Sequence, residues 1–189
     1  MFRKRKIVVL IGFALDTQEV TYIKQILKLT DRDYGLIVSI TGIGALVGAF
    51  VAAVCSKKTN LKLYIGGGMF LTSIGYIFFY SSINFITATF SFAFLGFFMA
   101  FANTGYTTFF QNNVPVKIMG RFGSLASMVE GIIQITFTLL LGFLAKWFSL
   151  QLICLIFSIV GTLFAAILFV TILIPSKTNY FKESSNLTH

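Results

Sequence analysis

The chain has 189 residues, of which 57% are hydrophobic and only 11% are charged. A soluble domain of this size is usually about a quarter charged, so this composition excludes a water-soluble globule and favours a membrane protein. A formal net charge of +9 would suggest nucleic acid in a soluble protein, but here the cations fall between apolar stretches, and we expect no nucleic-acid partner.

The first predicted element is a span over residues 7–29, the weakest of six candidates. It begins with the apolar run "IVVLIGFAL" and then carries Asp16, Gln18 and Glu19 within "LDTQEV". Asp16 lies about 15 Å beyond Lys6 along a helix, near the middle of a hydrocarbon core roughly 30 Å thick. A basic start before an apolar run would also suit a signal peptide, but no clear small-x-small cleavage site follows.

Two apolar spans follow over residues 35–55 and 63–83. The first contains "GIGALVGAFVAA", in which Gly44 and Gly48 have the four-residue spacing that allows another helix to approach closely. We expect a packing role for this glycine ridge, although a helix that moves during transport would use the same surface. The third span, 63–83, has only Ser and Thr as polar groups, and we expect it to face lipid.

The fourth span, 85–110, carries a polar face towards one end, with Asn103, Thr104, Thr107 and the following Gln111. Hydroxyl side chains in membrane helices mostly bond to their own backbone or to a neighbour. We therefore expect a structural role for the threonines. The amide of Asn103 could either bond to another helix or bind a substrate.

The fifth span, 122–145, contains Glu130 roughly 13 Å beyond Arg121 along a helix. A polar stripe with helical spacing runs through this span and consists of Gly123, Ser127, Glu130, Gln134 and Thr138. The sixth span, 150–174, is almost entirely apolar. Polarity therefore concentrates in the first, fourth and fifth spans, which we expect to line a wet cavity while the third and sixth face lipid.

The distribution of Lys and Arg supports six spans and assigns their sides. If 7–29 crosses the bilayer, 11 cations share a side with both termini and 4 lie on the other, whereas without that crossing the split is 7 against 8. The positive-inside rule then places both termini in the cytoplasm. The predicted fold is an all-α membrane protein, with six transmembrane helices within residues 1–175 and a polar cytoplasmic tail over 176–189.

Three carboxylates inside the predicted spans are the candidate functional groups. A charge at the bilayer centre costs about 2.5–3.5 kcal/mol on insertion scales, so such residues usually have a function. We expect Asp16 and Glu130 to face a shared polar cavity with at least one of them protonated much of the time, because desolvation disfavours the charged form. Glu19 would be an outer member paired with Lys24. Alternatively, Asp16 bonds a neighbouring helix and never titrates.

No catalytic constellation emerges from the sequence. There is no Ser–His pair, no metal-ligand spacing and no glycine-rich phosphate loop. The single histidine is the last residue, His189, which excludes a histidine-based site within the spans. We therefore expect no enzymatic activity, no metal and no cofactor.

The stretch "TTFFQNNVPVKIMGRFGSL" resembles the cytoplasmic connection between helices ten and eleven of the major facilitator superfamily. Bacterial drug and macrolide exporters of that family commonly have a Gln, a Val-Pro and a Gly-Arg at this spacing. Here these are Gln111, Val114–Pro115 and Gly120–Arg121. "DYGLIVSITGIGALVGAF" resembles their eighth helix, and the resemblance runs from about residue 5 to residue 175. It implies the second six-helix half of a twelve-helix transporter, in which the helices matching our first and fourth spans line the substrate path.

The resemblance implies proton-coupled efflux of amphipathic drug-like compounds across the bacterial plasma membrane. The chain would act as the C-terminal half of a split or truncated transporter, with the bilayer, a small-molecule substrate, and either the missing N-terminal half or a second copy as partners. The substrate cavity would include Gln18, Asn103, Thr104, Thr107 and Gln134, with Asp16, Glu130 and Glu19 for protons or a substrate cation. An inactive transporter remnant and a membrane assembly or regulatory protein stay open as alternatives.

Overall fold

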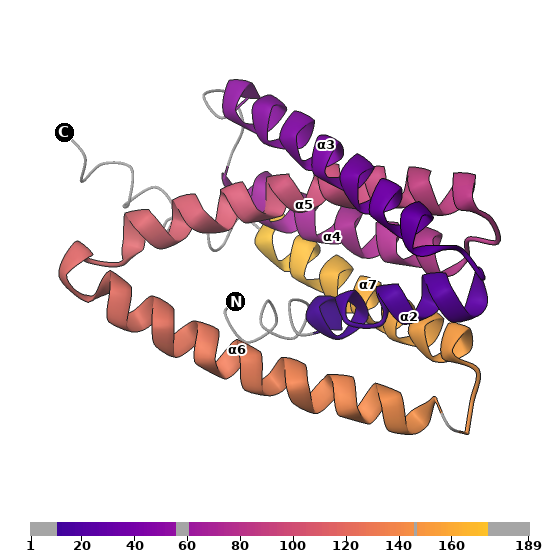
Figure 1. Cartoon of the computed structure of the whole chain (residues 1–189). Coiled ribbons are helices and arrows are strands. Elements are labelled where there is room, and N and C mark those ends of the chain that lie inside the picture. The colour runs from indigo at the N-terminus through magenta and orange to yellow at the C-terminus, as the bar shows by residue number, and fades with distance from the viewer. Residues whose placement is uncertain (1–10, 56–60, 146, 174–189) are drawn as a thin grey trace.

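The computed structural model describes residues 11–55, 61–145 and 147–173. All regular elements in this part of the chain are helical (Figure 1). The long helices are α3 (Asp31–Cys55), α4 (Leu61–Tyr80), α5 (Phe85–Asn113), α6 (Val116–Leu144) and α7 (Leu150–Leu173). The basic N-terminus, most of the loop after α3 and the C-terminal tail lie outside the described residues, so the charge-based orientation stays a prediction.

Among the described residues, four helices are long and apolar enough to cross a membrane: α3, α5, α6 and α7. The apolar part of α4 is shorter, but the whole helix has 20 residues. At 1.5 Å per residue this is about 30 Å, the thickness of the hydrocarbon core. The predicted span 63–83 extends beyond the end of α4 at Tyr80. The connection to α5 must start there, because Asn84 already caps α5 by accepting a hydrogen bond from the Thr87 backbone N–H.

The first segment is not one continuous helix, because it is interrupted within "LDTQEV". Residues 11–16 are helical, a turn follows at 17–18, and the chain continues as α2 (Glu19–Thr21) and a π-helix (Tyr22–Ile26). The Thr17 hydroxyl donates to the Ala14 carbonyl, 2.8 Å away, and such local bonds compete with the helical backbone pattern. The break therefore falls where the sequence places its intramembrane carboxylates, and π-turns are frequent at functional sites.

Glycines allow α3 and α5 to lie in close contact. A Cβ added at Gly44 would come 2.5 Å from the backbone oxygen of Ala93, and one at Gly48 would collide with the backbone of Phe97. On the opposite helix, a Cβ at Gly96 would collide with the backbone of Thr41. The predicted glycine ridge thus lies at the crossing of α3 and α5, where only a missing side chain permits this separation.

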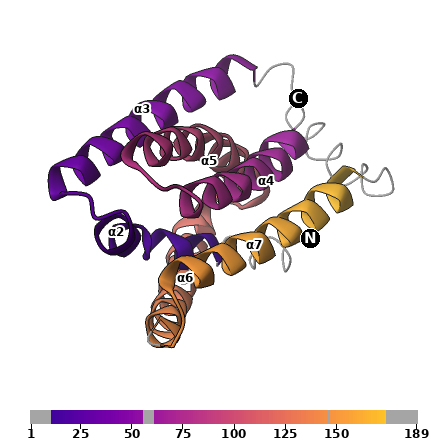
Figure 2. The ribbon, with the colours of Figure 1, turned by 90° about the vertical axis from the view of Figure 1, so that its right-hand side faces the viewer.

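Helix α4 lies at the centre of the bundle, between α5 and α7 (Figures 1 and 2). Its residues Tyr76, Phe79 and Tyr80 are buried in the largest apolar cluster, together with Tyr22 from the first segment. The expectation that the third span faces lipid is therefore wrong. The prediction fails because tyrosine counts as hydrophobic in the sequence pattern. A buried tyrosine hydroxyl needs a hydrogen-bond partner, so Tyr76 and Tyr80 direct this helix towards other parts of the protein and not towards lipid.

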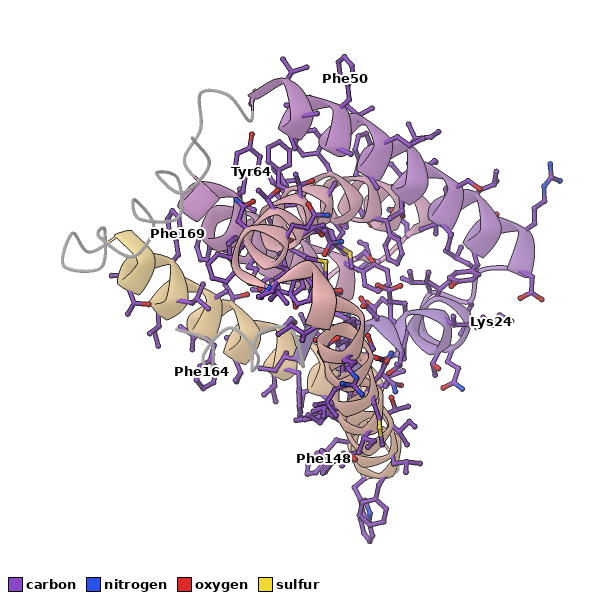
Figure 3. The ribbon with its side chains drawn as sticks, turned by 90° about the vertical axis from the view of Figure 1, so that its left-hand side faces the viewer. Lys24, Phe50, Tyr64, Phe148, Phe164 and Phe169 are labelled. Carbon is purple, nitrogen blue, oxygen red and sulfur yellow. The ribbon has the colours of Figure 1, made fainter. Side chains whose placement is uncertain are left out.

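Helix α6 diverges from the other helices along most of its length (Figures 1 and 2). It meets the bundle near its C-terminal end, where Leu141 packs against Ala14 and Ile153. There the Thr138 hydroxyl also lies 3.1 Å from that of Thr17. Aromatic side chains elsewhere, such as Phe50 of α3 and Phe148 beyond α6, point away from the bundle (Figure 3).

Candidate functional site

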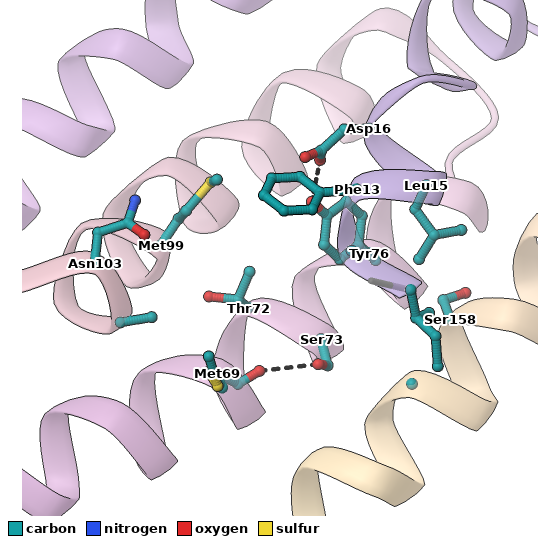
Figure 4. Close-up of a pocket in the computed structure, with 14 residues that line it drawn as sticks. Phe13, Leu15, Asp16, Met69, Thr72, Ser73, Tyr76, Met99, Asn103 and Ser158 are labelled. Carbon is teal, nitrogen blue, oxygen red and sulfur yellow. Dashed lines mark hydrogen bonds between the residues drawn. The ribbon is translucent and has the colours of Figure 1, made fainter. Parts of the chain in front are cut away.

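Asp16 lies at a partly enclosed cavity of about 110 Å³ near the centre of the bundle (Figure 4). Four elements form its walls: the helical segment 11–16, α4, α5 and α7. Most of the surface that lines it is apolar, and Phe13, Met69 and Met99 contribute to it. Methionine adapts its shape to irregular ligands, so this wall suits an apolar molecule better than a small hydrated ion.

The carboxylate of Asp16 has a specific partner in this cavity. The Tyr76 hydroxyl of α4 donates a hydrogen bond to Asp16 Oδ1 (Figure 4). Nearby hydroxyls are already engaged with their own backbone, since Thr72 donates to the Gly68 carbonyl at 2.8 Å and Ser73 to that of Met69 at 2.9 Å. When the carboxyl of Asp16 is ionised, the hydrogen bond from Tyr76 therefore stabilises its negative charge.

Glu19 lies at a second, more open pocket, a groove of about 930 Å³ between α3 and α5. Asn103 and Met99 line both this groove and the cavity of Asp16, so the two spaces meet at α5. Thr104 also lines the groove, and its hydroxyl donates to the Ala100 carbonyl at 2.8 Å. The structure therefore gathers Asp16, Glu19, Asn103 and Thr104 around two adjoining spaces.

The predicted pairing of Glu19 with Lys24 is wrong. Lys24 Nζ forms an ion pair with Asp31 Oδ1 at the start of α3 instead, and Lys24 lies at the edge of the molecule (Figure 3). Within the described residues, the Glu19 carboxylate has neither an ion pair nor a hydrogen bond. Its charge instead interacts with that of Asp16, which lies one turn earlier.

The structure does not bring Glu130 together with Asp16. Glu130 and Gln134 lie on α6 and line neither of these two pockets, because α6 diverges from the bundle there. They do lie on the face of α6 that carries Thr138, which follows Gln134 by one helical turn and Glu130 by about two, and Thr138 contacts Thr17 of the first segment. Only the C-terminal end of this face contacts the first segment, and Glu130 and Gln134 lie before that contact.

The other predicted residues lie outside both pockets. Gln18 is buried at the break in the first segment, and Thr107 is exposed on α5. The loop-motif residues Gln111, Pro115, Gly120 and Arg121 are exposed around the connection between α5 and α6. Pro115 directly precedes α6 as its N-cap residue, where its missing N–H costs nothing.

Tyr22, Tyr76, Tyr80 and Gln151 are site residues that the sequence interpretation missed. The Tyr22 hydroxyl donates within a buried network, 2.9 Å from the carbonyls of both Tyr80 and Ser82. Tyr80 donates to the Leu15 carbonyl at 2.6 Å, and Gln151 Nε2 of α7 donates to the Tyr22 hydroxyl at 3.2 Å. This network fixes the segment next to Asp16 against α4 and α7. Two tyrosines four residues apart in an apolar span would have been the signal.

Comparison with known families identifies the chain. A sequence model described as the Major Facilitator Superfamily matches residues 8–187, which include both pockets. Comparisons with curated proteins and with solved structures find no match. Among the described residues, there is also no group of three or more His, Cys, Asp or Glu side chains that could hold a metal ion.

Proposed function

The chain belongs to the major facilitator superfamily of membrane transporters, and on this basis we propose that it takes part in proton-coupled efflux of amphipathic drug-like compounds. It would act as a six-span bundle of the plasma membrane with both termini in the cytoplasm. The observation that carries the proposal is the position of Asp16: a carboxylate at a helix break, beside a cavity with apolar walls, bonded to one tyrosine.

The surroundings of Asp16 support a role in proton coupling. An ionised carboxylate inside a bilayer costs about 2.5–3.5 kcal/mol, which favours uptake of a proton. The hydrogen bond from Tyr76 stabilises the ionised form instead. Because these effects oppose one another, either protonation state is accessible, and a proton bound from one side and released to the other would bias a two-state conformational equilibrium.

We further propose that the transporting unit contains a second six-helix bundle, either a separate half or another copy of this chain. The polar stripe of α6, which includes Glu130 and Gln134, would then face that bundle across the substrate path. The exposure of α6 in the structure supports this arrangement, since polar side chains exposed to lipid are costly. In such an assembly Glu130 would be a second carboxylate available to protons.

Everted membrane vesicles from cells that express the full chain test the proposal. An imposed pH gradient should drive flux of the cationic dye ethidium, and Asp16→Asn should lower that flux at least about tenfold while the chain still inserts normally. Glu183→Gln, in the predicted polar tail, is the control and should leave the flux unchanged. Equal flux in Asp16→Asn and the unaltered chain would refute proton coupling through Asp16. No flux from the unaltered chain would refute transport by copies of this chain alone, which leaves a separate half or an inactive remnant.

A further inference from the structure

The connection between α6 and α7 presents two aromatic side chains, Trp147 and Phe148, which together form an aromatic corner. Trp147 is 76% exposed and Phe148 is 60% exposed, and Phe148 points away from the bundle (Figure 3). Tryptophan is highly buried on average in folded proteins. Two large rings that lie next to each other in the open are therefore a candidate contact surface.

The backbone holds the aromatic corner in place. The N–H groups of Trp147 and Phe148 both donate to the carbonyl of Leu144 at the end of α6, at 3.0 and 3.1 Å. On the other side of the turn, the Ser149 hydroxyl accepts a hydrogen bond from the Leu152 backbone N–H at 3.3 Å and caps the start of α7. The turn is thus bonded at both ends, and the fold directs its side chains outwards before any partner is present.

The two helices joined by the corner determine where it lies relative to a bilayer. Both α6 and α7 are long and apolar enough to cross a membrane, and the chain reverses its direction between Leu144 and Leu150. A chain that crosses and then returns places such a turn at one boundary of the hydrocarbon core. The predicted orientation makes this the outer boundary.

The apolar face of α6 leads into the aromatic corner. Ile132, Leu139 and Phe143 follow one another on this face at helical spacing, and all three are exposed. The polar stripe, for which a second bundle is proposed, lies on the opposite side of the helix. A protein that covers the stripe therefore leaves the apolar face, and the corner at its end, in contact with lipid.

We propose that the aromatic corner is a docking surface for the interfacial region of the bilayer, where acyl chains meet the polar headgroups. Indole suits this region because its ring is apolar, while its N–H can donate to the oxygen atoms of lipid esters and phosphates. The side chain of Phe148 has no polar atom and enters the upper part of the acyl chains. Because α6 has few other neighbours (Figure 1), this contact fixes the depth of its C-terminal end. The inference goes beyond the proposed function and does not depend on transport.

Tryptophan fluorescence of the full chain in phosphatidylcholine vesicles tests this contact, because Trp147 is the only tryptophan in the sequence. The quenchers are lipids brominated either near the headgroup or near the terminal methyl of the acyl chain, and iodide present on both sides of the bilayer. The shallow bromolipid should quench Trp147 at least about twofold more strongly than the deep one. Iodide should quench it at least about threefold less than N-acetyltryptophanamide in buffer, because the bilayer interface shields the ring from water.

Three variants calibrate this measurement. Ile132 lies about 18 Å from the end of α6 at Leu144, near the middle of a core roughly 30 Å thick. In Ile132→Trp combined with Trp147→Phe, the deep bromolipid should therefore quench more strongly than the shallow one. Phe148→Ser should raise iodide quenching of Trp147 about twofold, because the corner loses apolar contact with lipid. Ile83→Ser, in the connection between α4 and α5 where Ile83 is 80% exposed, is the matched control and should leave it unchanged.

Each contrary outcome overturns the assignment. Strong quenching by iodide with little quenching by either lipid would place the corner in water. Stronger quenching by the deep lipid than by the shallow one would place it in the hydrocarbon core. Protection from iodide and from both lipids would mean that protein, such as another copy of the chain, covers the corner. Unchanged iodide quenching in Phe148→Ser would exclude Phe148 from the contact. Because no flux is measured, a failure of proton-coupled transport leaves this inference untouched, and its own failure leaves the transport proposal untouched.

Discussion

The hydroxyl of Tyr76 and the carboxylate of Asp16 form the contact on which coupling would depend. Tyr76 is fixed in the apolar cluster of α4, so its hydroxyl is presented to Asp16 by packing and does not need to be ordered when a substrate arrives. The sequence identifies Asp16 because a carboxylate in an apolar span is costly. It does not identify Tyr76, because that residue lies 60 positions away and only tertiary packing brings the two together.

Replacing Tyr76 by Phe keeps the ring and removes the donor. The ionised form of Asp16 then loses a hydrogen bond to a charged group, worth about 1.5–3 kcal/mol. Protonation becomes easier, so the pH at which flux is half-maximal should rise by about one to two pH units. The measurement is the pH profile of ethidium flux in vesicles. Tyr64→Phe is the control, since its hydroxyl bonds to the Ala52 carbonyl far from Asp16, and an unchanged profile in Tyr76→Phe would contradict the pairing.

At the scale of the elements, the apolar runs of the sequence indicate the positions of the long helices well. The stretch 85–110 lies within α5, and 150–174 differs from α7 by one residue at its end. The sequence pattern does not predict the break in the first segment, because Thr17, whose hydroxyl bonds to the Ala14 carbonyl there, has the same kind of bond available inside unbroken helices. Nor does hydropathy reveal that α4 is central, since order along the chain says little about which helices become neighbours.

The crossing of α3 and α5 should tolerate no side chain at Gly48. Gly48→Ala forces a Cβ against the backbone of Phe97, which cannot move aside as a side chain would, so the helices must separate. We expect a loss of about 1–3 kcal/mol in the free energy of unfolding, measured by denaturation of the purified chain in detergent. Gly35→Ala, which enters open space, should be neutral or slightly stabilising. Equal stability of the two variants would show that the close approach is not required.

At the scale of the whole molecule, α6 is the helix that has few neighbours along most of its length (Figure 1). Its apolar face, with Leu125, Ile132 and Leu139 exposed, suits lipid. Its opposite face carries the predicted polar stripe and touches the bundle near Thr138 and Leu141. The helical spacing in the sequence identifies this stripe, and within the described residues α6 is the least buried of the four candidate membrane spans.

Cysteine crosslinking in native membranes tests whether a second bundle covers the polar face of α6. With Cys55 and Cys154 replaced by Ala, Ser127→Cys places a thiol in the polar stripe and Leu125→Cys places one on the opposite face. Because the two positions lie on nearly opposite sides of the helix, only Ser127→Cys should react with a bundle across the substrate path. A product of twice the mass would identify a second copy, and a product of another mass would identify a separate half. Monomer alone from Ser127→Cys, or equal crosslinking from both positions, would contradict the assembly, because the polar stripe would then have no specific partner.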